Sequence, residues 1–187
     1  DDSDHPLIIK VASIQAARMQ VYFIDNEEYF QRKQTYRDAD GTFYADNDDR
    51  AIFFGRGVLE TVKKLGWSPD IIHCHGWMTG LIPLLIKTSY KEDPMFHNSK
   101  VVYSLYNDSF DEPFNTNFGK KILMDGLTAA DVKELKDPNY VSLTKLAMQW
   151  SDAVVKSSPT IHDQVETAFK KLTKPTLDYK SPEEYIE

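Results

Sequence analysis

Two histidines and a cysteine offer the clearest chemistry in the sequence, and they stand together as His73-Cys74-His75. If this run is a strand, alternate side chains share a face, so both imidazoles lie on one face and the thiol on the other. Two imidazoles can bind a metal, but a zinc site needs three or four protein ligands. The sequence has no third ligand at a fitting spacing, so we expect a hydrogen-bonded pair and no metal. We expect Cys74 in the core, because no base that would activate it as a nucleophile is identifiable on its face.

The stretch 67–87 that surrounds them reads as a loop, a buried strand, a tight turn and a helix. Pro69 ends whatever precedes it, and apolar, partly β-branched residues follow, as in a buried parallel strand. Gly76 suits a sharp turn, and from Trp77 the apolar residues return at helical spacing. Ligands of open α/β sheets bind beyond the carboxyl ends of the strands. We therefore expect any ligand near His75.

The other elements are predicted from similar signals. Further strands are expected at 6–14, 19–25, 100–106, 152–157 and 174–179. Helices are expected at 26–32, 46–65, 118–125, 128–135, 138–150 and 158–172, and from 181 onward. The first two strands are predicted to form a hairpin, and the rest alternate with helices. This order indicates an α/β fold, a Rossmann-like parallel sheet with helices on both faces. The loops His75-Gly76, Tyr106-Asn107 and Ser158-Pro159 are expected to converge on one crevice.

Composition narrows the class of protein. The 187 residues suffice for one domain, which we place at 1–187. Truncation of this domain at both ends is an alternative that the sequence leaves open. The net charge of −7 argues against a basic nucleic-acid-binding surface. No apolar run approaches the ~20 residues that a membrane span needs, so we expect no membrane partner. A single cysteine fits a reducing compartment, and we predict a cytoplasmic location.

Several segments resemble one enzyme family. PDIIHCHGWMTGLIPL (69–84) is similar to the pattern Pro-Asp-Val-Val-His-x-His-Asp-Trp-His-x-Gly-Leu-x-Pro of bacterial glycogen synthases and plant starch synthases. SLYND (104–108) resembles the family's Thr-x-His-Asn-Leu, and VYFIDNEEYFQRKQTY (21–36) resembles a third segment. The match covers roughly 19–165. It implies the acceptor-side, Rossmann-like lobe of a two-lobed GT-B glycosyltransferase, a family that moves glucose from ADP-glucose to the end of an α-1,4-glucan with retention.

The resemblance also implies a set of substrate-binding positions, with no catalytic residue, metal or cofactor assigned to this chain. These candidates are His75, Gly76, Met78, Tyr106, Asn107, Asp46, Arg50 and Ser158. Asp46 and Arg50 either hold a sugar or form a helix cap and an i, i+4 pair. Asn107 either bonds a sugar hydroxyl, which we favour, or makes a local turn.

Other positions in these loops have structural readings. Ser158-Pro159 is most simply a helix start. The aromatic loop Tyr106, Phe110 and Phe114 either stacks on a glucan or, as we favour, packs in the core.

The chain departs from the family pattern where donor chemistry is expected. Where the family has His-Asp-Trp-His, this sequence has His75-Gly76-Trp77-Met78. The thioether of Met78 cannot donate a hydrogen bond to a sugar or a departing diphosphate. Met78 either lines the crevice or fills a gap in the core. The family's Lys-x-Gly-Gly loop and second lobe are also absent from the sequence.

Three functions remain open at this point. The first is a glycogen synthase-like glucosyltransferase whose second lobe or partner chain lies elsewhere, inactive as a single lobe. The second is a stand-alone, catalytically silent relative that binds a glucan or a protein partner. The third is a Rossmann-like binding module unrelated to sugar transfer. The small-molecule partner that the resemblance implies for the chain is an α-glucan or a nucleotide-sugar.

Overall fold

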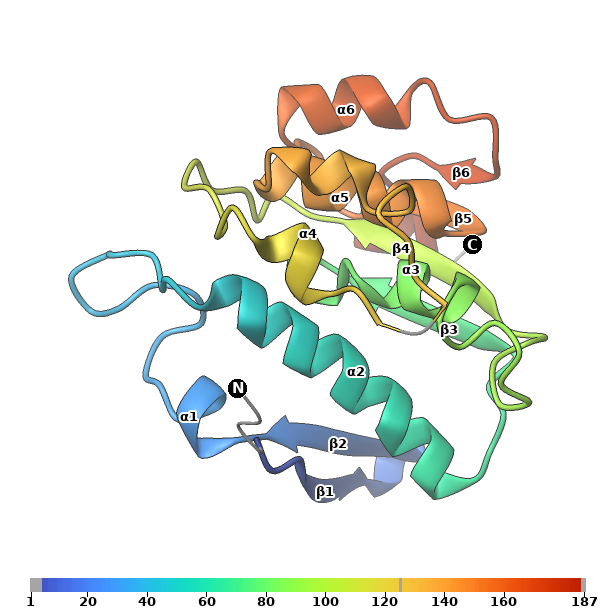
Figure 1. The fold of residues 1–187 in the computed structure, drawn as a ribbon. Helices are drawn as coiled ribbons and strands as arrows, with labels where there is room; N and C mark the ends of the chain where they lie inside the picture. The colour runs from blue at the N-terminus through green and yellow to red at the C-terminus, as the bar shows by residue number, and fades with distance from the viewer. Residues whose placement is uncertain (1–4, 125, 186–187) are drawn as a thin grey trace.

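Two separate sheets form the framework of the protein. The computed structural model describes residues 5–124 and 126–185 (Figure 1). Strands β1 (Ile8–Ile14) and β2 (Met19–Asp25) form the expected antiparallel hairpin. A parallel sheet has the strand order β3-β4-β5-β6, with bounds Ile71–His75, Lys100–Leu105, Ala153–Lys156 and Thr176–Leu177. The predicted α/β class and parallel sheet are confirmed.

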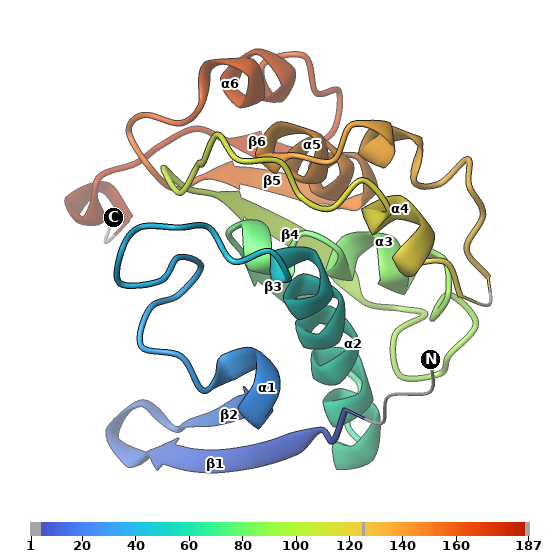
Figure 2. The same cartoon turned by 60° about the vertical axis from the view of Figure 1, so that its left-hand side comes forward.

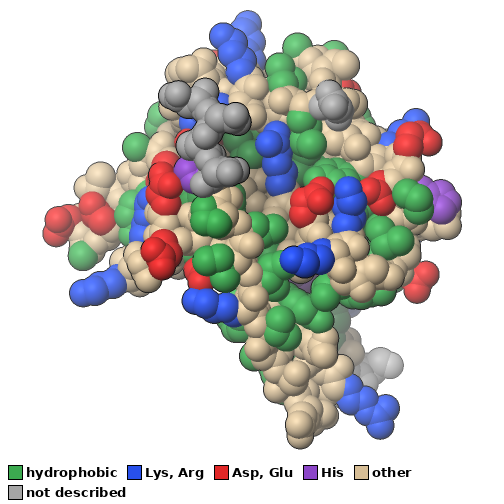
Figure 3. All heavy atoms as spheres, turned by 60° about the horizontal axis from the view of Figure 1, so that its bottom comes forward, with side chains coloured by type: hydrophobic (Ala, Val, Ile, Leu, Met, Phe, Trp, Pro, Cys, Tyr) green, Lys and Arg blue, Asp and Glu red, His purple; other side chains and the backbone are tan. Residues whose placement is uncertain are grey.

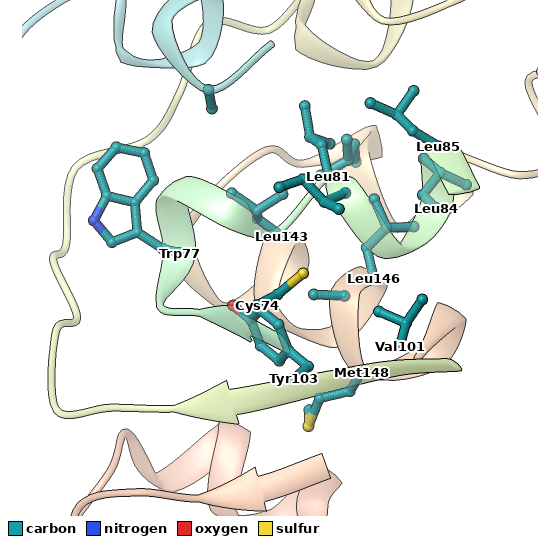
Figure 4. Packing of buried hydrophobic residues seen from close by; sticks show 14 of the residues in the cluster. Cys74, Trp77, Leu81, Leu84, Leu85, Val101, Tyr103, Leu143, Leu146 and Met148 are labelled. Atoms are coloured by element: carbon teal, nitrogen blue, oxygen red, sulfur yellow. The ribbon is translucent and has the colours of Figure 1, made fainter. Parts of the chain in front are cut away.

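Helices α3 (Ile82–Lys87), α5 (Tyr140–Trp150) and α6 (Asp163–Phe169) lie between successive strands in the chain. Because the strand order runs in one direction, right-handed crossovers place these helices on the same face of the sheet. Cys74 and Tyr103, register partners on that face, are buried beneath leucines of α5 and of the segment that leads into α3 (Figure 4).

The opposite face of the sheet is open at β3. Ile71 is 64% exposed there, and both His73 and His75 are exposed. Helices would cover both faces of the parallel sheet only if its strand order reversed. The order of the described strands, β3-β4-β5-β6, does not reverse.

Helix α2 (Asn47–Leu65) lies between the hairpin and the rest of the molecule (Figure 2). Its glycines allow close packing on both sides. A β-carbon placed on Gly57 would lie 3.0 Å from Leu7 and 3.1 Å from Ile24. One placed on Gly55, on the other side, would lie 3.6 Å from Leu85. Asp48, fully buried at the start of α2, is bound by Lys121 at 2.7 Å, which ties α2 to α4 (Phe118–Lys121).

Several predicted helices are shorter than expected or begin later. The segment after Gly76 is first a 3-10 turn, Trp77–Thr79, and only then α3. The helix expected at 128–135 is reduced to a 3-10 turn, Lys133–Lys136, and the one from 181 to another, Pro182–Tyr185. The helical turn expected at 26–32 is α1, Glu27–Phe30. Of the helix predicted at 118–125, α4 forms the first four residues, and Asp125 lies outside the described residues.

Capping side chains set two of the revised boundaries. Helix α5 begins after Asn139, whose side chain accepts from the Ser142 N–H in a capping box, and not at Pro138. Helix α6 begins after His162, whose Nδ1 accepts from the Gln164 N–H, so the helix start predicted at Ser158-Pro159 is wrong. The last predicted strand, 174–179, shortens to β6.

Candidate functional site

The carboxyl ends of β3, β4 and β5 bring most of the predicted site residues together. The imidazole of His75 is hydrogen-bonded through Nδ1 to the Tyr106 hydroxyl at 2.8 Å. The Asn107 backbone N–H donates to Ser158 Oγ at 3.1 Å. The parallel pairing of the three strands places these residues at one edge, as the sequence predicts. We call His75, Tyr106, Asn107 and Ser158 the strand-end cluster.

The two histidines are engaged by different hydroxyl groups. His73 Nε2 lies 2.7 Å from Ser104 Oγ, and the two imidazole rings are 4.1 Å apart. Although both residues are exposed, partial burial of their rings against the sheet lowers the pKa of both histidines, and the nearby His75 lowers that of His73 further. Both imidazoles are therefore neutral at pH 7, able to donate from one nitrogen and accept at the other. Among the described residues, no group of three or more His, Cys, Asp or Glu side chains is arranged to hold a metal.

The turn after β3 is fixed from three directions. Gly76 has φ +72° and ψ 177°, a conformation that favours glycine. Its carbonyl accepts hydrogen bonds from the Tyr103 hydroxyl at 3.1 Å and from Thr79 Oγ1 at 2.9 Å. The next backbone N–H, of Trp77, donates to Asp108 Oδ2 at 3.2 Å. This turn therefore holds His75 in a defined position at the end of its strand.

Asp108 is the residue of this region that sequence reasoning missed. Its Oδ1 accepts the Tyr140 hydroxyl at 2.8 Å, so its carboxylate joins the turn after β3 to α5. Burial raises the pKa of Asp108, and the hydrogen bonds from Tyr140 and Trp77 partly offset that rise. A signal was present in the sequence, because Asp108 stands where the family pattern has leucine.

Three other predictions for this region can be compared with the packing. Cys74 is buried in the core as predicted, and burial raises its pKa to about 12. Phe110 and Phe114 are buried and pack on Trp77 with ring centroids 5.3 and 5.7 Å away, so the core alternative is confirmed for both. Met78 is half-buried and packs against the same core, which favours the gap-filling alternative.

Asp46 and Arg50 belong to a different network, at the start of α2. Arg50 is 3% exposed and donates to the Tyr29 carbonyl at 2.9 Å and to Asn47 Oδ1 at 2.6 Å. Asp46 makes no side-chain cap and instead binds the guanidinium of Arg32. The cap and the i, i+4 pair, one of the two alternatives that the sequence left open, are replaced by these contacts, because the 26–32 segment folds back over the helix start.

A cavity of about 310 Å³ lies on the hairpin side of the molecule and shares no residue with the strand-end cluster. It is lined by aromatic rings, including Tyr29 and Phe53, and by charged groups, including Arg56 and Lys121. Hydrophobic side chains lie among charged ones on this side (Figure 3).

Comparison with known proteins decides the family. The family model described as the starch synthase catalytic domain matches residues 2–176. The chain belongs to this starch synthase family. Glycogen synthase of Chlorobium limicola (strain DSM 245 / NBRC 103803 / 6330) is 43% identical over 107 residues, 57% of this chain and 22% of the relative. Glycogen synthase of Chlorobium luteolum (strain DSM 273 / BCRC 81028 / 2530) is 33% identical over 162 residues, 85% of this chain and 33% of the relative.

The fold of this starch synthase family member also has a solved counterpart. The catalytic domain of starch synthase IV from Arabidopsis thaliana, bound to ADP and acarbose, superposes with a TM-score of 0.63 at 20% identity. The superposition covers 91% of this chain and 36% of that chain. The chain thus spans about a third or less of the length of the curated relatives given above. Within residues 5–124 and 126–185, no helix is long and apolar enough to cross a membrane.

Proposed function

We propose that this chain is the acceptor-side lobe of an ADP-glucose-dependent glucosyltransferase, and that its strand-end cluster binds an α-glucan. The observation that carries the proposal is the convergence of His75, Tyr106, Asn107 and Ser158 at the carboxyl ends of three parallel strands. Neutral imidazole, phenol, amide and hydroxyl groups both donate and accept, which suits the hydroxyl groups of a sugar. The relatives named glycogen synthase and the neighbour that binds ADP and acarbose support this ligand class.

We further propose that the lobe does not transfer glucose by itself. Loss of a nucleoside diphosphate is accelerated by cationic groups placed where the negative charge develops. Lys156, the last residue of β5, is already bound to Glu166 at 2.8 Å. Met78 offers no hydrogen-bond donor where the family pattern has histidine. The cationic groups would come from a second lobe or a partner chain.

A calorimetric titration with maltoheptaose tests the binding half of the proposal. Wild type should bind, and Asn107→Ala should weaken binding several-fold, because it removes an amide from the strand-end cluster. Asn98→Ala is the matched control, since Asn98 is exposed in another loop and should leave the Kd unchanged. Absence of binding heat in wild type, or equal effects of the two variants, would refute the assignment.

Transfer of radiolabelled glucose from ADP-glucose to glycogen tests the catalytic half. The purified chain should incorporate no more label than a blank without protein. Incorporation above the blank would show that one lobe is enough.

A catalytically silent, glucan-binding relative is the second candidate, and the packing of Met78 against the core favours it. The two candidates differ in their response to the donor. For transfer, donor and acceptor must be bound side by side, so an acceptor-side lobe that still contacts the transferred glucose should bind ADP-glucose weakly without displacing maltoheptaose. The silent relative predicts no binding of ADP-glucose.

A further inference from the structure

Gly76 and Asp108 face each other across the candidate site. The two residues belong to loops after different strands, β3 and β4. A β-carbon placed on Gly76 would nevertheless lie 2.7 Å from Asp108 Oδ2, closer than real β-carbons approach. The Asp108 carboxylate therefore occupies the space beside position 76 that a side chain there would need.

A carboxylate beside position 76 can accept a backbone hydrogen bond from the start of the following turn. Gly76 precedes the helical turn Trp77–Thr79, and the first N–H groups of such a turn have no partner within it. An aspartate at the preceding position usually accepts one of them, and glycine has no side chain to do so. Here Asp108 accepts the Trp77 N–H at 3.2 Å from the neighbouring loop. Its second oxygen is held by the Tyr140 hydroxyl at 2.8 Å, so the carboxylate is itself anchored to α5.

We infer that Asp108 is a positioning residue that caps the turn after β3 in place of a side chain at position 76, and that residues 76 and 108 are a linked pair. Glycine at 76 makes room for the carboxylate, and the carboxylate supplies the cap that glycine lacks. Through this turn Asp108 fixes His75 relative to Tyr106. The capping role of Asp108 does not depend on the proposed function. Only the statement that the turn positions an imidazole at a glucan site rests on it.

An exchange of the two residues tests the linkage. Four proteins are compared: wild type, Asp108→Leu, Gly76→Asp, and the double variant Gly76→Asp/Asp108→Leu. Asp108→Leu should lower Tm, because it removes the cap. Gly76→Asp should lower Tm further, because it adds a β-carbon at positive φ against the Asp108 carboxylate. The double variant should lose clearly less than the sum of the two single losses, because the collision is gone and a carboxylate is again available.

The backbone amide signals of Trp77 and Thr79 in an NMR spectrum report on the cap itself. The Trp77 signal should move upfield in Asp108→Leu, and in the double variant a signal typical of an amide bonded to carboxylate should return in this turn. Asp111→Leu is the matched control, because Asp111 is an exposed acid of the same loop, and it should move neither Tm nor these signals.

The outcomes separate this inference from the proposed function. Additive losses of Tm, or a Trp77 signal that Asp108→Leu does not move, would overturn the linkage whether or not a glucan binds. Failure of wild type to bind maltoheptaose would refute the proposed function and leave the exchange result standing.

Discussion

Removal of the Tyr140 hydroxyl tests how Asp108 is held beneath the candidate site. Tyr140→Phe keeps the ring, which is 2% exposed and packs against Phe110 at a centroid distance of 5.5 Å. It deletes the O–H that donates to Asp108 Oδ1 at 2.8 Å and that also lies within hydrogen-bonding distance, 3.3 Å, of the Tyr106 carbonyl. Because Tyr140 is only 2% exposed, bulk water has little access to the vacated position, and the carboxylate loses this partner.

The expected cost follows from the kind of bond that is lost. A hydrogen bond to a charged group contributes ~1.5–3 kcal/mol. For a chain of this length, ~1 kcal/mol shifts Tm by ~2–4 °C, so Tyr140→Phe should lower Tm by ~3–12 °C. The bond from Tyr140 lowers the pKa of Asp108 against the effect of burial, so the variant should raise that pKa further. The lost stability is therefore largest at neutral pH and shrinks as the pH falls and the carboxyl group becomes protonated.

Thermal melts and urea unfolding of wild type and variant, at neutral and at acidic pH, measure the loss of stability and its dependence on pH. Tyr90→Phe is the matched control, because the Tyr90 hydroxyl also donates to a carboxylate, Glu60 at 2.7 Å. Glu60 has a half-exposed side chain, so water can replace that donor and the loss should be smaller. If Tyr140→Phe costs no more than Tyr90→Phe, or if its cost does not depend on pH, the anchoring role of Asp108 is wrong.

Three further predictions concern residues around the site. Arg50→Ala should lower the free energy of unfolding in urea by at least ~2 kcal/mol, because it leaves the Tyr29 carbonyl unpaired. It should leave the maltoheptaose Kd unchanged. Weaker binding of maltoheptaose would show that Arg50 contributes to the glucan site. Met78→His should cost ~1–3 kcal/mol, because Met78 packs against the core and an imidazole there lacks a partner; an unchanged Tm would show that position 78 is open to solvent. The imidazole NMR titrations of His73 and His75 should have midpoints below the ordinary ~6.5, since burial lowers both pKa values, so the stability that they contribute is present above that pH and lost as the pH falls. Midpoints at or above the ordinary value would show that the partial burial of the two rings does not lower their pKa values.

The sequence was sufficient to predict the parallel strands and the residues that follow them. Alternating apolar runs, Pro69 and Gly76 mark β3 and its turn, and the carboxyl-end rule then places His75 beside Tyr106. Helix boundaries were less accurate where the signal was a proline. Ser158-Pro159 resembles a helix start, yet α6 begins after the His162 side chain, which caps it.

The contacts that fix the site are long-range and leave no local pattern. Asp108 reads as one acid in a polar loop until Trp77 and Tyr140, from two other segments, are placed around it. The same holds for Arg50, whose partner carbonyl belongs to Tyr29. Sequence spacing paired Arg50 with Asp46, but the fold of the preceding segment decides the partner.

Mapping of maltoheptaose binding by backbone amide chemical shifts tests the central claim most directly. The account predicts concentration-dependent shifts at His75, Gly76, Tyr106, Asn107 and Ser158, the residues at the carboxyl ends of β3, β4 and β5. It predicts that the amides at the start of α2, around Asp46 and Arg50, stay unchanged. Shifts confined to α2, or no shifts at a saturating concentration of the sugar, would contradict it.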